Sequence, residues 1–430
     1  MILKKILFII FIVLFILAIL LRIHLAHYPS IFVDTNHLGR IEEISSYYIS
    51  LFNTNNPNHP FIKNIGYYFC PDFLYASTVG INWHPPAYHI TCALLSTINY
   101  HKHIFIIKLY NLFFNLFTIY ILFLLLRHLF KKDYELIFLG LNLLMFLPAH
   151  IFFSNYCTND VLFVFLCTLF LLLSMKYDID NRSYGIIIVL SSLCALLLLT
   201  KYTGFICFIY LNSILLFALI KKNILFKDFF KYMLILWAIV AVLAGWFYYI
   251  NYRSLGNPVY MPGKSLVREH NFLSFKFIEL LFSTDNSWHG SSSVLTGFYA
   301  SLLVFDRIGI GMVSREIYLR NAVFCLSLFP LALIITGLVF NLTKEKYSKL
   351  NMFLLITILC IIRLLWRFKL SEGILKSSYI MFITPILSIY YAEGCRLMKG
   401  WNKNMFLSCF VFAIITDVVV IIYFYRFYMC

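Results

Sequence analysis

The sequence predicts an all-α fold: a polytopic membrane protein built from a bundle of transmembrane helices. Of its 430 residues, 62% are hydrophobic and only 13% are charged, and the mean hydropathy is +0.85. Soluble domains are nearer ~45–50% apolar and ~25% charged. Hydrophobic runs recur from end to end, which a soluble protein with one membrane anchor would not show. These runs do not alternate with polar residues, so the strands of a membrane β-barrel are excluded.

About eleven stretches are each near the ~20 residues that a membrane-spanning helix needs. In order they are Ile6–Leu21, Ile104–Leu126, Leu136–Phe153, Val161–Tyr177, Ile186–Leu199, Phe205–Ile220, Tyr232–Ile250, Val323–Phe340, Met352–Trp366, Tyr379–Ala392 and Met405–Tyr425. Two weaker apolar stretches, Ala87–Ile98 and Val294–Phe305, compete with them. We expect both to be interfacial or re-entrant helices on the outer face, because counting the first as a span would move a basic loop outside.

Positive charge is concentrated in every second short loop. The basic positions are Lys4 and Lys5; Arg127, Lys131 and Lys132; Lys176 and Arg182; Lys221, Lys222, Lys227 and Lys231; Lys344, Lys346 and Lys349; and Arg396, Lys399 and Lys403. Because such loops stay on the cytoplasmic side, we expect the N terminus inside and the C terminus outside, in a multi-pass protein of the bacterial inner membrane. The net charge of +16 is then mostly a topology signal. Membrane lipids are expected partners, and nucleic acid is not.

Polar side chains gather in the segments expected outside. We treat residues 1–430 as a single membrane domain, with a first outer loop at 27–103, a second at 251–320 and a shorter one near 367–378. Ordinary connections have only ~2–8 residues, and long ordered loops usually carry function. The stretch Ile81–Tyr88 cannot lie in a membrane helix, since Pro85 and Pro86 have no backbone N–H to donate.

Few kinds of chemistry fit an enzyme on this outer face. The sequence contains no Walker loop, no G-x-G-x-x-G, no H-E-x-x-H and no cluster with metal-ligand spacing, so no cofactor and no metal site is predicted. Outside the cell there is no nucleotide supply, so a transferase needs a donor activated before it crosses the membrane, such as a polyprenyl-phosphate-linked sugar. Transfer then requires a carboxylate to accept a hydroxyl proton and cations to stabilise the leaving phosphate. Asp34, just beyond the first span, is placed for the first role.

Five separated motifs resemble those of the glycosyltransferase C superfamily, in its branch of dolichyl-phosphate-mannose–protein mannosyltransferases and aminoarabinose transferases. In chain order they are V-D-T-N-H at Val33–His37, H-P-P-A-Y-H at His84–His89, S-N-Y-C-T-N-D-V-L at Ser154–Leu162, T-K-Y-T-G at Thr200–Gly204, and W-F-Y-Y-I-N followed by G-N-P at Trp246–Pro258. The resemblance covers roughly the first 260 residues. No single motif is specific, but the five occur in the right order and topology.

The resemblance implies a membrane glycosyltransferase with the fold of that superfamily. Such an enzyme moves a sugar from a polyprenyl- or dolichyl-phosphate donor to the hydroxyl of an acceptor lipid, glycan or protein, with inversion. It implies Asp34 as the general base. It also implies a set of substrate-binding residues: His37, His84, Asn159, Asp160, Lys201, Arg253, Lys376 and Tyr379.

Two positions depart from the family pattern. Many relatives carry Arg directly before the Asn of the last motif, where this chain has Ile250, and its nearest arginine is Arg253. Many also have R-Y-L-L-P before the tenth span, where this chain has Tyr379 with Lys376 three residues earlier. We expect Arg253 and Lys376 to stand in for the usual arginines.

Simpler roles and other classes remain open. Asp34 can be a solvated loop residue, His84 can pack its Pro-Pro turn, Asp160 can cap the fourth span, and Lys201 can be an interfacial lysine. A transporter or flippase of lipid-linked sugars is one alternative, but it would be expected to show internal repeats, and none is seen. A family member without activity is the other, and the acidic residue at Asp34 argues against it.

Overall fold

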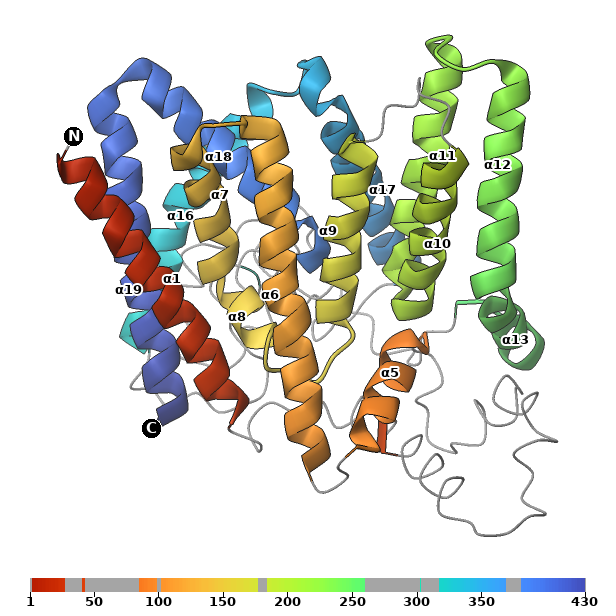
Figure 1. The fold of residues 1–430 in the computed structure, drawn as a ribbon, viewed down its shortest axis with the longest axis horizontal. Coiled ribbons are helices and arrows are strands. Elements are labelled where there is room, and N and C mark those ends of the chain that lie inside the picture. Colours follow the sequence, from red (N-terminus) through yellow and green to blue (C-terminus); the bar gives the residue numbers. More distant parts are fainter. Residues whose placement is uncertain are drawn as a thin grey trace. The chain divides into compact units, whose positions relative to one another are not determined.

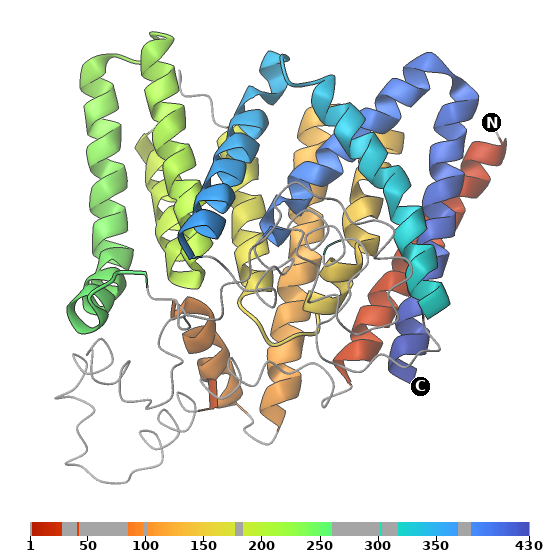
Figure 2. The same ribbon diagram turned by 180° about the vertical axis from the view of Figure 1, so that it is seen from behind.

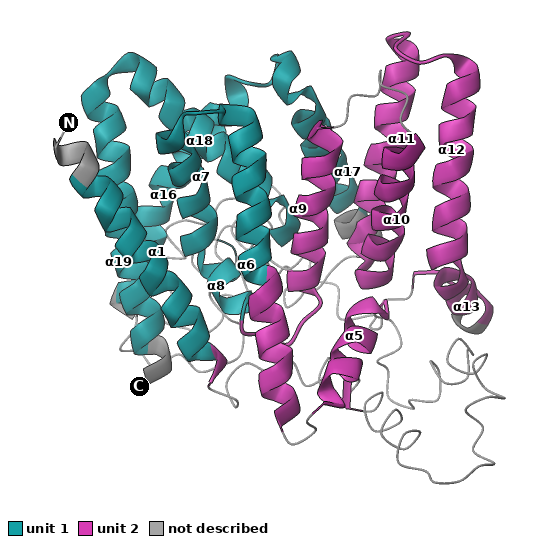
Figure 3. Cartoon of the chain, in the orientation of Figure 1, with its two compact units in different colours: residues 1–25, 115–154, 264–430 teal, residues 26–114, 155–263 magenta. Residues whose placement is uncertain are grey.

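The computed structural model describes residues 2–27, 41–42, 85–98, 102–176, 184–259, 302, 317–368 and 380–429. Within these ranges the regular secondary structure is helical, and no strand occurs (Figure 1), as the sequence predicts. The chain divides into two units (Figure 3): a first of residues 1–25, 115–154 and 264–430, and a second of residues 26–114 and 155–263. Helix α6 (His103–Phe130) begins in the second unit and continues into the first.

The predicted spans coincide with helices. Each predicted stretch overlaps a helix of the structure. In the described ranges, six helices are long and apolar enough to cross a membrane: Ile6–Ala26, His103–Phe130, Tyr202–Ile220, Phe226–Arg253, Asn321–Val339 and Lys403–Arg426. The protein is therefore an integral membrane protein, and the larger number of crossings stays a prediction.

One predicted span is interrupted. The sequence predicts a single helix over Leu136–Phe153, whereas the structure has α7 (Tyr134–Phe146) and a short α8 (Pro148–Phe153). Leu147 between them has extended backbone, with φ −63° and ψ 117°. A proline disfavours helical backbone at the preceding residue and has no N–H to donate. Pro148 therefore ends α7 and starts α8.

Of the two weaker apolar stretches, the structure describes the first but not most of the second. The first forms α5 (Ala87–Ser96), whose 10 residues give a helix of roughly 15 Å, too short to cross a bilayer. This length agrees with the expected interfacial or re-entrant helix. The second, Val294–Phe305, lies outside the described residues apart from Leu302.

The first unit is a helical bundle arranged around α18 (Thr384–Trp401). Three helices pack against α18, namely α7, α16 (Ile317–Val339) and α19 (Lys403–Met429). α19 also contacts α7 and α16, and α16 and α18 cross each other in Figure 2. α18 has an unbroken buried run over Ser388–Cys395.

α16 and α18 cross at two glycines. A Cβ on Gly337 would lie 2.0 Å from the carbonyl oxygen of Tyr390, and a Cβ on Gly394 would lie 2.2 Å from that of Leu333. Neither side chain nor backbone can relieve such an overlap without moving a helix, so the crossing requires glycine at both positions. Small residues that let backbones approach are the common packing device of membrane helices.

An arginine is buried in α1 (Ile2–Ala26). The sequence places Arg22 at the outer flank of the first span, but in the structure it lies within α1 and is fully buried. Its guanidinium donates to Asn115 Oδ1 at 3.2 Å, to the Ala18 carbonyl at 3.1 Å and to the Met145 carbonyl at 2.5 Å. These acceptors supply the hydrogen bonds that a buried charge needs.

Three of the basic loops meet at one end of the first unit. Lys346 Nζ donates to the carbonyl of Leu129 at 2.7 Å, and Lys399 Nζ lies 3.1 Å from Asp133 and 3.0 Å from Glu135. Burial lowers the pKa of Lys399, but the hydrogen bonds to Glu135 and Asp133 outweigh it, so the pKa is raised overall. The loops after α6, α16 and α18 thus share one side, as the charge pattern predicts, and its cytoplasmic location stays a prediction.

The second unit is arranged around α10 (Tyr184–Thr200). α10 contacts four helices: α5, α9 (Asp160–Lys176), α11 (Phe205–Ile220) and α12 (Phe226–Val240). α11 and α12 form a hairpin, seen clearly in Figure 2. A π-helical turn at Ala241–Gly245 continues α12 into α13 (Trp246–Leu255). The start of α9 and the end of α10 lie at the same end of this unit, because Asp160 pairs with Lys201.

Candidate functional site

Four of the five sequence motifs lie in the second unit and meet there. Their contacting residues form what we call the motif cluster: Tyr88, Asn159, Asp160, Lys201, Tyr202 and Asn251, together with Asn111 of α6. The third motif bonds directly to the fourth and the fourth to the fifth, and Asn111 bridges the second motif to the third. The first motif, with Asp34 and His37, lies outside the described residues.

An ion pair joins the third and fourth motifs. Asp160, the first residue of α9, accepts a hydrogen bond from Lys201 Nζ on Oδ1 and one from Thr158 Oγ1 on Oδ2, the latter at 2.7 Å. The Asp160 and Lys201 side chains are only 6% and 13% exposed. Both carboxylate oxygens of Asp160 therefore have protein donors, which fits a group that positions α9 and α10 and not a general base.

Asn159 adds a second link at the same place. Its Nδ2 donates to the Thr200 carbonyl at 2.8 Å. That carbonyl belongs to the last turn of α10, whose final carbonyls have no partner within the helix. Asn159 thus ties the start of α9 to the end of α10, next to the pair between Asp160 and Lys201.

Tyr202–Gly204 form a tight 3₁₀ turn between α10 and α11. Lys201, just before it, is extended, which directs the chain out of α10. A Cβ on Gly204 would lie 2.6 Å from the Leu197 carbonyl carbon and 2.7 Å from its oxygen. The glycine of the T-K-Y-T-G motif is therefore required by a close approach to the last turn of α10.

The fifth motif is bound to this turn. Asn251 Nδ2 lies 3.2 Å from Tyr202 Oη and 3.3 Å from the Pro258 carbonyl. Gly256 ends α13 in the left-handed region, with φ 67°, which glycine adopts readily. Tyr248 Oη donates to the Leu198 carbonyl at 2.9 Å. The asparagine of the motif therefore holds both the 3₁₀ turn and the segment that follows α13.

The second motif reaches the cluster through α5. Tyr88 Oη donates to Asn111 Oδ1 at 3.2 Å, and Asn111 Nδ2 donates to the Tyr156 carbonyl at 2.6 Å. Tyr88 and Asn111 are both fully buried. Burial raises the pKa of the Tyr88 phenol well above its usual range, so it stays protonated and acts as a donor. Asn111 thereby bridges the second and third motifs.

The other predicted site residues are placed as follows. Arg253 is exposed in the last turn of α13, in the same helix as Asn251. His84, Lys376 and Tyr379 lie outside the described residues, as do Asp34 and His37. Among the residues that the structure does describe, no group of three His, Cys, Asp or Glu side chains is arranged to hold a metal ion.

Sequence reasoning missed the polar stripe of α6. Lys108, Asn111, Asn115 and Thr118 are all essentially fully buried. Their spacing of three and four residues places them on one face of the helix. The signal was present in the sequence, because a regular polar stripe inside an apolar span marks the face that packs against protein.

The comparisons with known proteins come from structure alone, since no protein-family model and no curated protein matches the sequence. The structure is similar to that of ArnT from Cupriavidus metallidurans bound to undecaprenyl phosphate, with a TM-score of 0.49 and 15% identity over 91% of this chain and 61% of that one. It is also similar to the Archaeoglobus fulgidus oligosaccharyltransferase in its apo form, with a TM-score of 0.47 and 12% identity over 91% of this chain and 56% of that one. A third match is the same oligosaccharyltransferase tethered to an acceptor peptide. Its TM-score is 0.43, with 13% identity over 91% of this chain and 55% of that one.

This chain spans 61% of the length of ArnT and 55–56% of the length of the oligosaccharyltransferase chains.

Proposed function

We propose that this protein is a membrane glycosyltransferase that uses a polyprenyl-phosphate-linked sugar as donor and an acceptor hydroxyl on the extracytoplasmic face. The observation that carries the proposal is the motif cluster. Motifs that are individually unspecific are joined in the second unit by the contacts of Tyr88, Asn159, Asp160, Lys201 and Asn251.

The expected orientation of the cluster supports a lipid-linked donor. The cluster lies where α10 ends and α11 begins, and the basic Lys221–Lys222 turn lies at the other end of α11. Basic loops stay cytoplasmic, so the cluster is expected at the outer interface. No nucleotide sugar is supplied there, whereas a polyprenyl phosphate dissolves its tail among the helices and leaves its headgroup at the interface.

The proposed reaction is a direct displacement at the anomeric carbon. Asp34 accepts the proton of the acceptor hydroxyl, whose oxygen forms the new bond as the bond from the anomeric carbon to the phosphate oxygen breaks. The configuration inverts, and polyprenyl phosphate leaves with the negative charge. Arg253, Lys376 and Lys201 are the candidate cations for that charge, because fixed cations act most strongly at a low-dielectric interface.

The cluster itself is assigned a positioning role in this scheme. Asp160 has protein donors on both oxygens and Asn159 holds the end of α10, so neither is available as the base. They fix the turn that presents Lys201 and Tyr202. His37, His84 and Tyr379 are retained as proposed substrate-binding residues on the strength of the motifs.

The test is donor consumption by the purified protein in lipid nanodiscs. Radiolabelled undecaprenyl-phosphate sugars are incubated with lipid, glycan and protein acceptor fractions, and both released undecaprenyl phosphate and labelled acceptor are measured. We expect wild-type protein to release the lipid phosphate only with a matching acceptor. Asp34→Asn is expected to lower the rate by roughly 10²- to 10⁴-fold.

The controls separate the alternatives. Asp133→Asn is the matched carboxylate control, because Asp133 pairs with Lys399 in the first unit, and it is expected to keep the wild-type rate. If Asp34→Asn were fully active, the base would be sought elsewhere in the first loop, beginning with Glu42, which lies 2.8 Å from His103 Nε2. Movement of intact donor across liposomes without cleavage would establish the flippase alternative instead.

A further inference from the structure

A carboxyl group lies near the middle of α19, in a helix long and apolar enough to cross a membrane. This residue, Asp417, has a relative exposure of 1%. It is the one acidic residue within the predicted span Met405–Tyr425. Ionisable side chains within a membrane span are costly and are usually retained for a function.

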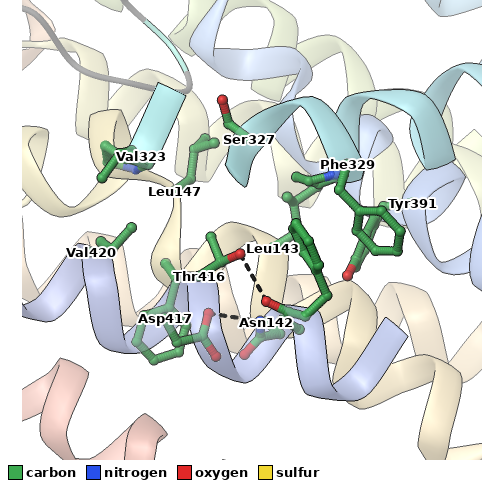
Figure 4. A pocket seen from close by; sticks show the side chains of 15 residues that line it. Asn142, Leu143, Leu147, Val323, Ser327, Phe329, Tyr391, Thr416, Asp417 and Val420 are labelled. Atoms are coloured by element: carbon green, nitrogen blue, oxygen red, sulfur yellow. Dashed lines mark hydrogen bonds between the residues drawn. The ribbon is translucent and has the colours of Figure 1, made fainter. Parts of the chain in front are cut away.

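Asp417 lines a cavity of about 40 Å³ inside the first unit (Figure 4). The polar side chains of the lining are Asn142 of α7, Ser327 of α16, Tyr391 of α18, and Thr416 and Asp417 of α19. The other lining residues are apolar. We call this space the Asp417 cavity. It is large enough for a small ion or one water molecule, which needs ~10–15 Å³.

The cavity presents acceptors that lack donors. Asn142 Nδ2 donates to Asp417 Oδ1 at 3.0 Å, and the two groups face each other in Figure 4. Among the described residues, Asp417 Oδ2 and Asn142 Oδ1 have no hydrogen-bond partner. The amide orientation is set by Asp417, because turning it over would place two acceptor oxygens together. Either a proton on the Asp417 carboxyl group or a bound cation would supply what the pair lacks.

Pro330 interrupts the backbone hydrogen bonding of α16 beside the cavity. This proline lies inside α16 and lines the cavity beside Ser327 and Phe329. Proline has no N–H, so the carbonyl four residues earlier, that of Leu326, loses its helical hydrogen bond.

We propose that the Asp417 cavity is a binding site for a small monovalent cation of the sodium class. One carboxylate supplies one negative charge, which one monovalent cation neutralises, whereas a divalent cation would leave an excess positive charge in an apolar bundle. The polar lining offers amide, hydroxyl and carboxylate oxygens, which hard cations such as Na⁺ prefer over sulfur or imidazole. No Lys, Arg or His side chain in the described part of the chain pairs with Asp417, so an ionised Asp417 has no protein counter-ion there.

The test is sodium-dependent thermal stability of the full-length protein in detergent. NaCl replaces N-methyl-D-glucamine chloride at constant ionic strength, so that only the small cation changes. A ligand that binds the folded state raises Tm in proportion to the logarithm of its concentration above Kd. We expect the Tm of wild-type protein to rise with Na⁺ in this way, and Asp417→Asn, which keeps the shape but removes the charge, to show no Na⁺ dependence.

Two further variants keep the test decisive if Asp417→Asn does not fold. Asn142→Leu retains the charge and removes one ligand, and it is expected to shift the Na⁺ midpoint by about tenfold or more. Asp228→Asn, at a half-buried carboxyl in the first turn of α12, is the matched control and is expected to respond like wild type. Retention of ²²Na⁺ by wild-type protein, lost in Asn142→Leu, would support the site directly. The proposal would be overturned if the Tm of wild-type protein rose equally with Na⁺ and with N-methyl-D-glucamine. It would also be overturned if the Tm of Asn142→Leu and of Asp417→Asn depended on Na⁺ as that of wild-type protein does.

Discussion

Asp160, the first residue of α9, and Lys201, the residue that follows α10, form a buried ion pair that fixes one end of the second unit. A charge buried without its partner is far more costly than a pair. The two residues therefore constrain each other, and substituting one of them also tests the other. Variants of this pair can therefore distinguish a structural function of Lys201 from a role in donor binding.

The first prediction concerns the cost of breaking this pair. Lys201→Met leaves the Asp160 carboxylate without its cation, and breaking a buried pair typically costs about 3–5 kcal/mol. We expect a corresponding fall in the free energy of unfolding, measured by denaturant titration of the protein in mixed micelles. Lys399→Met is the matched control, because the side chain of Lys399 is 37% exposed and surface pairs contribute only about 0–1 kcal/mol.

The double variant Asp160→Asn with Lys201→Met completes the cycle. Removing both charges should restore most of the lost stability, because no uncompensated charge remains. If Lys201 serves only the ion pair, the double variant should also regain donor use. If the double variant regained stability but did not use the donor, Lys201 would be assigned to binding the leaving phosphate. If the double variant did not regain stability, the structural role of the pair would be contradicted.

The second prediction concerns Gly204. Its missing Cβ leaves room for the backbone of Leu197, which a Cβ would approach to 2.6 Å. Gly204→Ala must move the 3₁₀ turn away from α10, and overpacking of this kind costs typically about 1–3 kcal/mol. We expect Gly204→Ala to have a lower Tm than wild-type protein in differential scanning calorimetry. Gly400→Ala, where nothing lies within 4 Å of the added Cβ, should leave Tm unchanged or slightly raise it, and equal losses in both variants would argue against the close approach.

The third prediction concerns topology. The basic loops predict a cytoplasmic location for Lys222 and an outer location for Cys430. Reporter fusions after these two residues, using one reporter active inside and one active outside the cell, should therefore give opposite results. A shared location for both fusions would contradict the odd number of crossings. A fusion after Lys346 should match the one at Lys222, because both lie in loops of the basic set.

The helices were predictable because hydropathy is a local property. Each predicted stretch overlaps a helix, and even the break before Pro148 follows from rules that act on adjacent residues. Helix ends were less predictable: α6 starts at His103 and ends at Phe130, beyond the apolar core of its span. The number of membrane crossings depends on how helices tilt and pack, which hydropathy alone does not determine.

The site was predictable only in part. The motifs singled out Asn159, Asp160 and Lys201 as candidates, but the sequence could not show that Asp160 pairs with Lys201 or that Asn159 donates to the Thr200 carbonyl. Such pairings arise from contacts between segments about forty residues apart, and no local pattern encodes them. Asp417 is the opposite case, because a lone acidic residue in an apolar span was a visible signal, and only its pairing with Asn142 required the structure.

The last prediction concerns the leaving phosphate and rests on the proposed function. Arg253 is exposed in the last turn of α13, the helix whose Asn251 bonds to Tyr202 beside Lys201. Lys376, outside the described residues, is expected just before the tenth predicted span. Loss of one charge-assisted contact costs roughly 1.5–3 kcal/mol, or about ten- to a hundredfold. We expect Arg253→Ala and Lys376→Ala each to lower kcat/KM for the lipid-phosphate donor by this factor while leaving the KM for acceptor nearly unchanged.

Kinetics with donor and acceptor varied separately decide between the two substrates. Lys227→Ala is the matched control, because Lys227 is exposed at the start of α12, the opposite end of the continuous helix that leads through the π turn into α13. Lys227→Ala lowers the net charge by as much as Arg253→Ala or Lys376→Ala does, but it leaves the proposed phosphate site intact. We therefore expect normal donor kinetics from this variant. If Arg253→Ala and Lys376→Ala changed only the acceptor KM, the cations would belong to the acceptor site. If all three variants lost the same amount of kcat/KM for the donor, the effect would be a general electrostatic attraction of the anionic donor and not a specific phosphate site.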